Sequence, residues 1–152
     1  MTNNAMAWVD NVTVWSGLAA WFIAQTAKLV GNFVETKKVD PALFLALGGM
    51  PSSHSASVSA VATSVGLRVG FDSPIFAVAL AFALIVMIDA QSVRRAAGEQ
   101  ARLVNQIVAE LFKEHKLSQE KLAELLGHTF MEVMLGMLMG VLTAILFHAF
   151  WK

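Results

Sequence analysis

The stretch "PIFAVALAFALIVMIDA", residues 74–90, decides the class of fold, because it is apolar as far as Asp89. A helix needs about 20 predominantly apolar residues to cross the hydrocarbon core of a bilayer, and this run is only slightly shorter. The whole chain of 152 residues has the same character, with 57% hydrophobic and 14% charged residues, whereas a soluble domain usually has about 25% charged residues. The sequence therefore predicts an all-α integral membrane protein, formed by a single domain over residues 1–152.

Three more segments are predicted to cross the membrane, at residues 8–28, 51–70 and 132–151. The last of them contains Gly136 and Gly140 in a G-x-x-x-G pattern, which permits close packing of helices. Residues 51–70 are mostly small and polar, so this helix suits a position surrounded by the other three. Together with residues 74–90, these segments predict a helical bundle of about four transmembrane helices.

Residues 92–127 differ from these spans because they are charged and amphipathic. Apolar residues recur at helical spacing between Val93 and Leu111. The opposite face carries Arg94, Arg95, Glu99, Arg102, Glu110 and Lys113. An amphipathic helix of this kind is typical of the membrane interface, and we expect it to lie there or to pack on the bundle.

Following the chain through four spans gathers its polar residues at one membrane face. The first span brings Lys28 to that face, the second starts there at "PSSH", and the third returns to it with Asp89. The amphipathic region stays there until the last span leaves. The residues gathered in this way are Gln25, Lys28, Ser52, Ser53, His54, Asp89, Arg94, Arg95, His128 and Glu132.

The same face holds nine of the eleven basic residues, and basic residues favour the cytoplasmic side of a membrane. We therefore expect the gathered residues to face the cytoplasm, with both termini outside, in the inner (plasma) membrane of a bacterium. The eleven basic residues balance eleven acidic ones, so the net charge indicates no nucleic-acid partner. The absence of cysteine excludes thiol nucleophiles and zinc–thiolate sites.

The gathered residues suit the chemistry of phosphate esters. Cations beside a helix N-terminus, with its free backbone N–H groups, bind phosphate. Two histidines provide one nucleophile and one general acid. Hydrolysis through a phosphohistidine intermediate would use the whole set without a metal, so the sequence predicts no metal ligand and no cofactor.

Three stretches carry a family resemblance: "GGMPSSHSA" (48–56), "IVMIDAQSVRRAAGEQARLVNQ" (85–106) and "LGHTFMEVMLG" (126–136). They resemble the divergent branch of the type-2 phosphatidic acid phosphatase superfamily, often described as acid phosphatase/vanadium-dependent haloperoxidase-related. The resemblance implies a membrane phosphatase acting on a phosphorylated lipid. Phosphatidylglycerophosphate, phosphatidate and isoprenoid phosphates are all candidate substrates.

The resemblance also implies roles for the candidate residues. His54 would protonate the leaving oxygen, His128 would attack phosphorus, and Glu132 would orient His128. The phosphate would be bound by Lys28, Ser52 and Ser53. Membrane lipids would surround the protein.

The motifs depart from the pattern of the superfamily. Ser53 stands where the second motif has glycine, Glu132 stands where the third motif has aspartate, and no Arg-Pro pair follows Lys28. The chain is also shorter than the usual six-span members, so a homodimer is expected to complete the site or the bundle. These departures favour one alternative function, a non-catalytic phospholipid-binding or scaffold membrane protein.

A further departure concerns the arginine of the third motif, because Leu122 stands six residues before His128. We expect Arg94 or Arg95 to supply that positive charge, with Asp89 positioning one of them. On an amphipathic helix, however, both arginines also suit contacts with lipid headgroups.

Structural roles remain open for several of these residues. His54 suits a polar cap, and Thr129 with Glu132 matches the pattern of a capping box, which would serve the helix and not the chemistry. Lys28 and Asp89 near span ends suit snorkelling or pairing. Gln25 is expected to form a hydrogen bond between helices.

Overall fold

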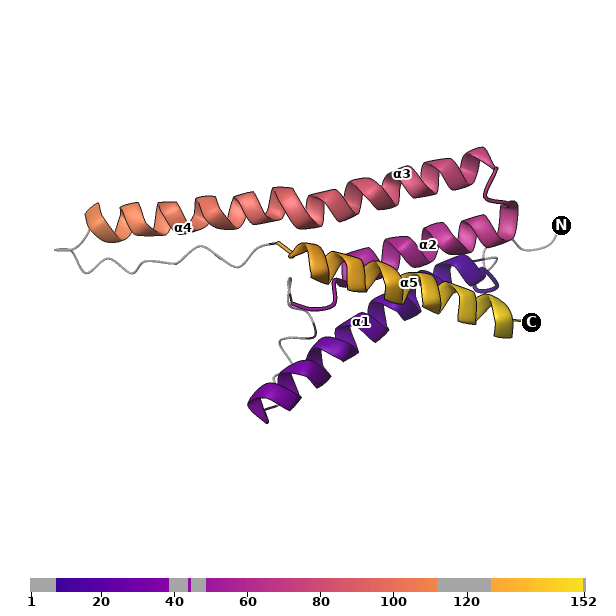
Figure 1. Cartoon of the computed structure of the whole chain (residues 1–152), viewed down its shortest axis with the longest axis horizontal. Coiled ribbons are helices and arrows are strands. Elements are labelled where there is room, and N and C mark those ends of the chain that lie inside the picture. Colours follow the sequence, from indigo (N-terminus) through magenta and orange to yellow (C-terminus); the bar gives the residue numbers. More distant parts are fainter. Residues whose placement is uncertain (1–7, 39–43, 45–48, 112–126, 152) are drawn as a thin grey trace.

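The protein is described here by a computed structural model, which covers residues 8–38, 44, 49–111 and 127–151. Helices make up nearly all of this part of the chain (Figure 1). They are α1 (Val12–Thr36), α2 (Ser53–Val69), α3 (Pro74–Ile88), the π-helix η3 (Asp89–Val93), α4 (Arg94–Leu111) and α5 (Phe130–Phe150). The predicted all-α class is confirmed.

Polar side chains fix where the helices begin. The side-chain oxygens of four N-cap residues each accept a hydrogen bond from a backbone N–H group of the first turn, which has no partner within the helix. These residues are Asn11, Ser52, Ser73 and Thr129. Pro74 follows its cap in the first turn of α3, where a missing N–H group costs no hydrogen bond.

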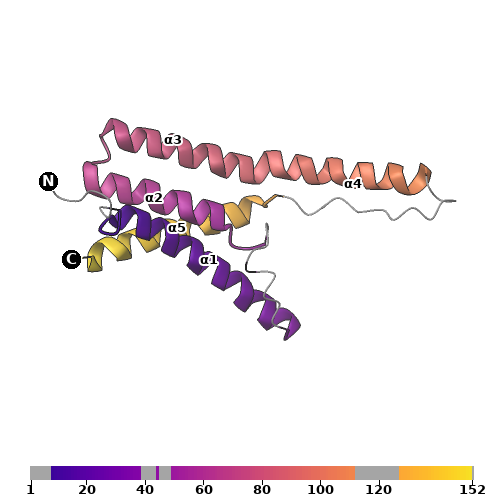
Figure 2. The same cartoon turned by 180° about the vertical axis from the view of Figure 1, so that it is seen from behind.

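Helix α2 lies at the centre of the bundle, as its small residues predict. It packs on α1, α3 and α5, and Figure 2 shows α3 on one side of it and α1 and α5 on the other. The alanines Ala20, Ala24, Ala56, Ala60 and Ala144 form the core where α1, α2 and α5 meet. Such small side chains allow the helix backbones to approach closely.

Gly136 and Gly140 bring α5 directly against α2. A Cβ atom on Gly136 would clash with the carbonyl oxygen of Ser52, and one on Gly140 would clash with the carbonyl oxygen of Ala56. Only glycine fits at these two positions, which confirms the close packing predicted from the G-x-x-x-G pattern. The approach also places the first turn of α5 beside the start of α2.

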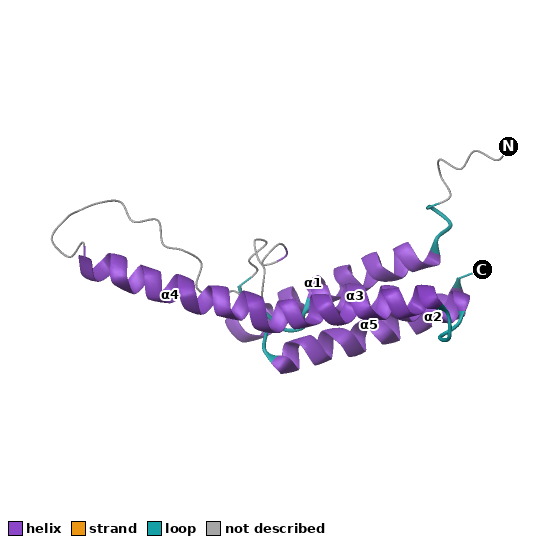
Figure 3. Cartoon of the chain, turned by 90° about the horizontal axis from the view of Figure 1, so that it is seen from above, coloured by secondary structure: helices purple, strands orange, loops and turns teal. Residues whose placement is uncertain are grey.

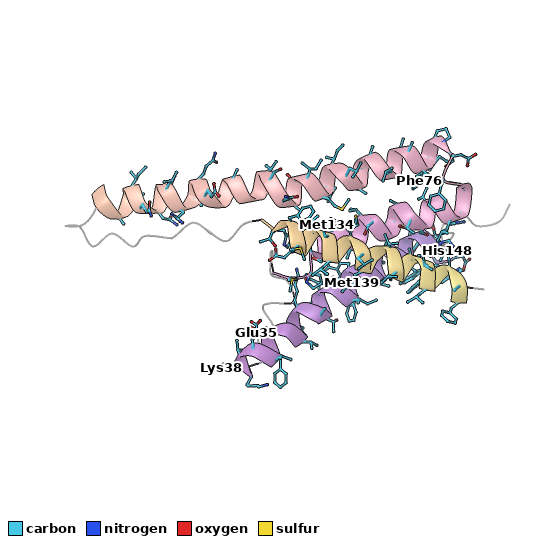
Figure 4. All side chains as sticks on the ribbon, viewed as in Figure 1. Glu35, Lys38, Phe76, Met134, Met139 and His148 are labelled. Atoms are coloured by element: carbon cyan, nitrogen blue, oxygen red, sulfur yellow. The ribbon has the colours of Figure 1, made fainter. Side chains whose placement is uncertain are left out.

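Helix α1 does not end where the first span was predicted to end. Lys28 lies within α1, which continues to Thr36 and ends at Lys37, in the left-handed conformation with φ of 57°. The apolar residues that follow Lys28 sustain the helix. Its last turns diverge from α2 and α5, and Figure 4 shows Glu35 and Lys38 at that diverging end.

The chain also does not turn where a span was predicted to give way to an interfacial helix. Helix α3 continues through η3 into α4 as one long rod, and α4 extends beyond the bundle (Figures 1 and 3). No proline or glycine interrupts residues 75–97, so nothing in this stretch breaks the helix. The amphipathic helix is present over Arg94–Leu111, in line with α3, while residues 112–126 of the predicted region lie outside the described part.

Two helical stretches are long and apolar enough to cross a membrane, Pro74–Ala109 and Phe130–Phe150. Only 11% of the most apolar stretch is buried in the first of these helices, and only 28% in the second. A core helix of a soluble protein would be mostly buried. Among the described helices, α1 and α2 do not meet the same criterion. Helix α1 contains Gln25 and Lys28, and α2 has only 17 residues and is rich in serine. The structure thus supports a helical membrane protein with two apolar spans, and the four-span bundle stays a prediction.

Candidate phosphate site

The candidate site lies where the start of α2, the start of α5 and the π-helix η3 come together (Figure 1). Two backbone hydrogen bonds join these ends. The Ser52 N–H group donates to the Glu132 carbonyl oxygen at 3.0 Å, and the His128 N–H group donates to the Ala90 carbonyl oxygen at 2.8 Å. His128 is therefore held between α5 and η3 by its backbone before its side chain makes any contact.

The side chain of His128 is paired with a carboxylate. Its Nδ1 atom lies 2.9 Å from Oε2 of Glu132, and the residue is only 3% exposed. When Nδ1 carries the hydrogen atom and donates a hydrogen bond to the carboxylate, Nε2 keeps its lone pair. An imidazole fixed in this tautomer is suited to attack an electrophile through Nε2.

The carboxylate of Glu132 has a second task. Its Oε2 atom also accepts a hydrogen bond from the Thr129 N–H group at 3.0 Å, and the Glu132 N–H group donates to Oγ1 of Thr129 at 3.3 Å. These two bonds form a capping box at the start of α5. Glu132 can therefore cap the helix and orient His128 at the same time, because its Oε2 atom contacts both the Thr129 N–H group and Nδ1 of His128.

His54 lies in the first turn of α2, next to the same space. Its ring centroid is 6.3 Å from that of His128, and the two planes are inclined by 58°. His54 lies in α2 and His128 immediately precedes the N-cap of α5, so the backbone contact of α2 with α5 at Gly136 sets the separation of the two rings. Two imidazoles at this separation can act on two atoms of one phosphoester.

Lys28 and the serines supply groups suited to an anion. Nζ of Lys28 donates to Oγ of Ser53 at 3.5 Å. Ser52 and Ser53 are almost completely buried. Oγ of Ser52 accepts hydrogen bonds from the Ser55 N–H group and hydroxyl, which leaves the Ser52 hydroxyl hydrogen as a donor.

The remaining predicted residues lie on the rod formed by α3, η3 and α4. Asp89 begins η3 and immediately precedes Ala90, whose carbonyl oxygen binds His128. The backbone of Arg94 and Arg95 starts α4 one turn later. The side chains of both arginines lie outside the described part, so their expected contact with phosphate stays a prediction.

Two features of the site were not predicted from the sequence. The first is the hydrogen bond from the His128 N–H group to the Ala90 carbonyl oxygen, because a motif of side chains does not predict which backbone groups pair. Gln25 was expected to form a hydrogen bond between helices, but its buried Oε1 accepts none from any residue in the part of the chain that is described, so this prediction is wrong for Oε1.

A second polar cluster lies at the opposite end of the bundle. Oγ of Ser64 donates to Oγ1 of Thr13 at 2.9 Å and lies 2.8 Å from Nε2 of His148, which joins α2 to α1 and α5. Figure 4 shows His148 near the end of α5. Arg68 donates to the side-chain oxygen of Asn11 at 2.9 Å in the same region. This cluster fastens the three helices at the end away from the candidate site.

The fold and the site together define a helical membrane protein with two histidines where its helices meet. The sequence profile of the Divergent PAP2 family covers residues 9–143, and the chain belongs to this family. The chain is also similar to YuiD, an uncharacterized membrane protein of Bacillus subtilis (strain 168). The two are 41% identical over 157 residues, which cover 96% of this chain and 99% of YuiD. No solved structure matches the chain.

Proposed function

We propose that this protein is a lipid-phosphate phosphatase, which hydrolyses a phosphomonoester through a phosphohistidine at His128. The observation that carries this proposal is the pairing of His128 Nδ1 with Glu132 at 2.9 Å, with the His54 ring 6.3 Å from the His128 ring. Membership of the Divergent PAP2 family supports the same chemistry.

The reaction would take place in two steps. Nε2 of His128 attacks phosphorus, the bond from phosphorus to the lipid oxygen breaks, and His54 gives its proton to that oxygen. Water then attacks the phosphohistidine, the P–N bond breaks, and His54 takes a proton from the water as inorganic phosphate leaves. Lys28 and the first backbone N–H groups of α2 stabilise the charge on the phosphoryl oxygens in both steps.

The substrate class follows from the position of the site. The chain presents His54 and His128 at a helix end beside strongly apolar helices, where a lipid headgroup would reach them and its tails would stay in the bilayer. Phosphatidylglycerophosphate, phosphatidate and isoprenoid phosphates meet this requirement equally. We place the site at the cytoplasmic face of the plasma membrane, because nine of the eleven basic residues fall on that side of the proposed topology.

The direct test is phosphate release by the purified protein in detergent, with a panel of lipid phosphates and a chelator. We expect release with at least one lipid, and a fall of about a thousandfold or more for His128→Ala, because the nucleophile is lost. The matched control is His148→Gln, which changes the histidine at the other end of α5 from His128 and should release phosphate at the native rate.

The second candidate function is a non-catalytic phospholipid-binding or scaffold protein. It is favoured by the capping box, which gives Glu132 a structural task that needs no turnover. In that case the native protein would bind lipid phosphates in a pull-down with vesicles, yet it would release phosphate no faster than His128→Ala on any lipid of the panel.

A further inference from the structure

Gln25 is a buried polar residue to which the proposed two-step reaction assigns no role. It is only 4% exposed, and its Oε1 atom accepts no hydrogen bond from the described residues. A buried amide oxygen without a partner is costly, and such groups in native proteins are usually satisfied by a bound molecule, most often water. Gln25 therefore indicates a bound hydrogen-bond donor.

The packing of α1 on α2 places Gln25 at the same level along the bundle as the candidate site. The two helices run antiparallel, since Thr13 is bonded to Ser64 and Gly17 lies against Val61. Moving eight residues along each helix from the contact of Gly17 with Val61 brings Gln25 level with Ser53. The bond from Lys28 to Ser53, one turn further along α1, agrees with this register.

The donor held by Gln25 must be small. Gln25 is almost completely buried, and the core beside it is lined with alanines, including Ala24 and Ala56. The phosphate groups themselves offer acceptors when ionised, whereas Oε1 needs a donor. Water meets both requirements, because it is small and donates two hydrogen bonds.

We propose that Gln25 positions the water molecule that hydrolyses the phosphohistidine, an inference that rests on the proposed function. Oε1 of Gln25 accepts one hydrogen of this water, and His54, the residue after Ser53, removes the other. The water oxygen attacks phosphorus, the bond to Nε2 of His128 breaks, and inorganic phosphate is released. The proton on His54 replaces the one that it gave to the lipid alcohol in the first step.

Rapid-quench measurement of the phosphoenzyme separates the two steps. Gln25→Met removes the acceptor and keeps the length and apolar volume of the side chain. We expect formation of the phosphohistidine to stay within about threefold of the native rate, and its hydrolysis to fall by about tenfold or more, so that the phosphoenzyme accumulates. Gln25→Glu retains an acceptor oxygen, and its hydrolysis step should be less impaired than that of Gln25→Met.

The matched control is Ser16→Ala, which removes another buried polar group of α1, whose hydroxyl donates to the Val12 carbonyl oxygen of the same helix. It should leave the ratio of the two rates unchanged. If Gln25→Met does not fold, Gln25→Leu takes its place, because it also removes the acceptor oxygen.

Two results would overturn the inference while leaving the proposed function intact. One is an equal fall in both rates for Gln25→Met. The other is unchanged kinetics together with a higher melting temperature, which would make Gln25 merely a buried polar group. A native protein that forms no phosphohistidine with any lipid phosphate would instead remove the proposed function, and the inference with it.

Discussion

One oxygen atom, Oε2 of Glu132, carries both a structural bond and a bond to the candidate nucleophile. Glutamine also serves at position N3 of a capping box, but it has no negative charge to stabilise an imidazolium. We therefore expect Glu132→Gln to lower phosphate release by about ten-thousandfold, as loss of the orienting carboxylate does in other histidine-based catalysts. Its melting temperature in detergent should stay close to that of the native protein.

The control at this position is Thr129→Ala, which removes the cap and leaves the carboxylate. It should destabilise the protein by about 1 kcal/mol and leave the release rate nearly unchanged. If Glu132→Gln released phosphate at the native rate, Glu132 would be a helix cap and nothing more.

Individual residues differ in how far the sequence could predict their positions. His54, His128 and Glu132 could be predicted, because threading the chain through a bilayer brings "PSSH" and the start of the last span to one face. The bond from His128 to Ala90 could not, since every residue has a carbonyl group and only the fold decides which one is used. The buried environment of Gln25 also depends on the register of α1 against α2, which a single sequence does not reveal.

At the scale of the helices, the contact of α5 with α2 sets the distance between the two histidines. Gly140→Leu would force a side chain against the Ala56 carbonyl oxygen and Oγ of Ser59. We expect a loss of about 3 kcal/mol in stability, which is typical of severe overpacking, and a loss of phosphate release as the helices separate. Thermal unfolding in detergent and the release assay measure the two effects.

Gly31→Ala is the matched control, because a Cβ atom on Gly31 would meet nothing within 4 Å. This variant should be as stable as the native protein or slightly more so, since alanine favours a helix interior over glycine by about 1 kcal/mol. If Gly140→Leu were as stable as Gly31→Ala, the close contact of α5 with α2 would be wrong.

The helices themselves could be predicted from apolar runs, but their ends could not all be predicted. The start of α3 follows from "SP" and that of α5 from the capping box. Helix α1 continues past Lys28, where the first span was predicted to end, because a charged residue ends an apolar run without ending a helix. The continuous helix from α3 through η3 to α4 was not predicted for a similar reason. Hydropathy falls at Asp89, but the residues there still favour a helix.

At the scale of the whole molecule, the polar ends of the bundle face opposite sides of the membrane in the proposed topology. Because the native chain has no cysteine, single cysteines at positions 37 and 152 report the orientation directly. A membrane-impermeant thiol reagent added to intact cells should label Lys152→Cys and not Lys37→Cys. Permeabilised cells provide the control, in which both positions should react. Labelling of position 37 in intact cells would contradict the proposed orientation.

The rod formed by α3, η3 and α4 is longer than a bilayer requires. The 36 residues from Pro74 to Ala109 measure about 54 Å at 1.5 Å per residue, against a hydrocarbon core of about 30 Å. If the rod crossed the bilayer upright, about 24 Å of it would therefore lie outside the hydrocarbon core. The hydrogen bond from the His128 N–H group to the Ala90 carbonyl oxygen ties the candidate nucleophile to η3, within this rod. A change in the tilt of the rod would thus shift the backbone that holds His128.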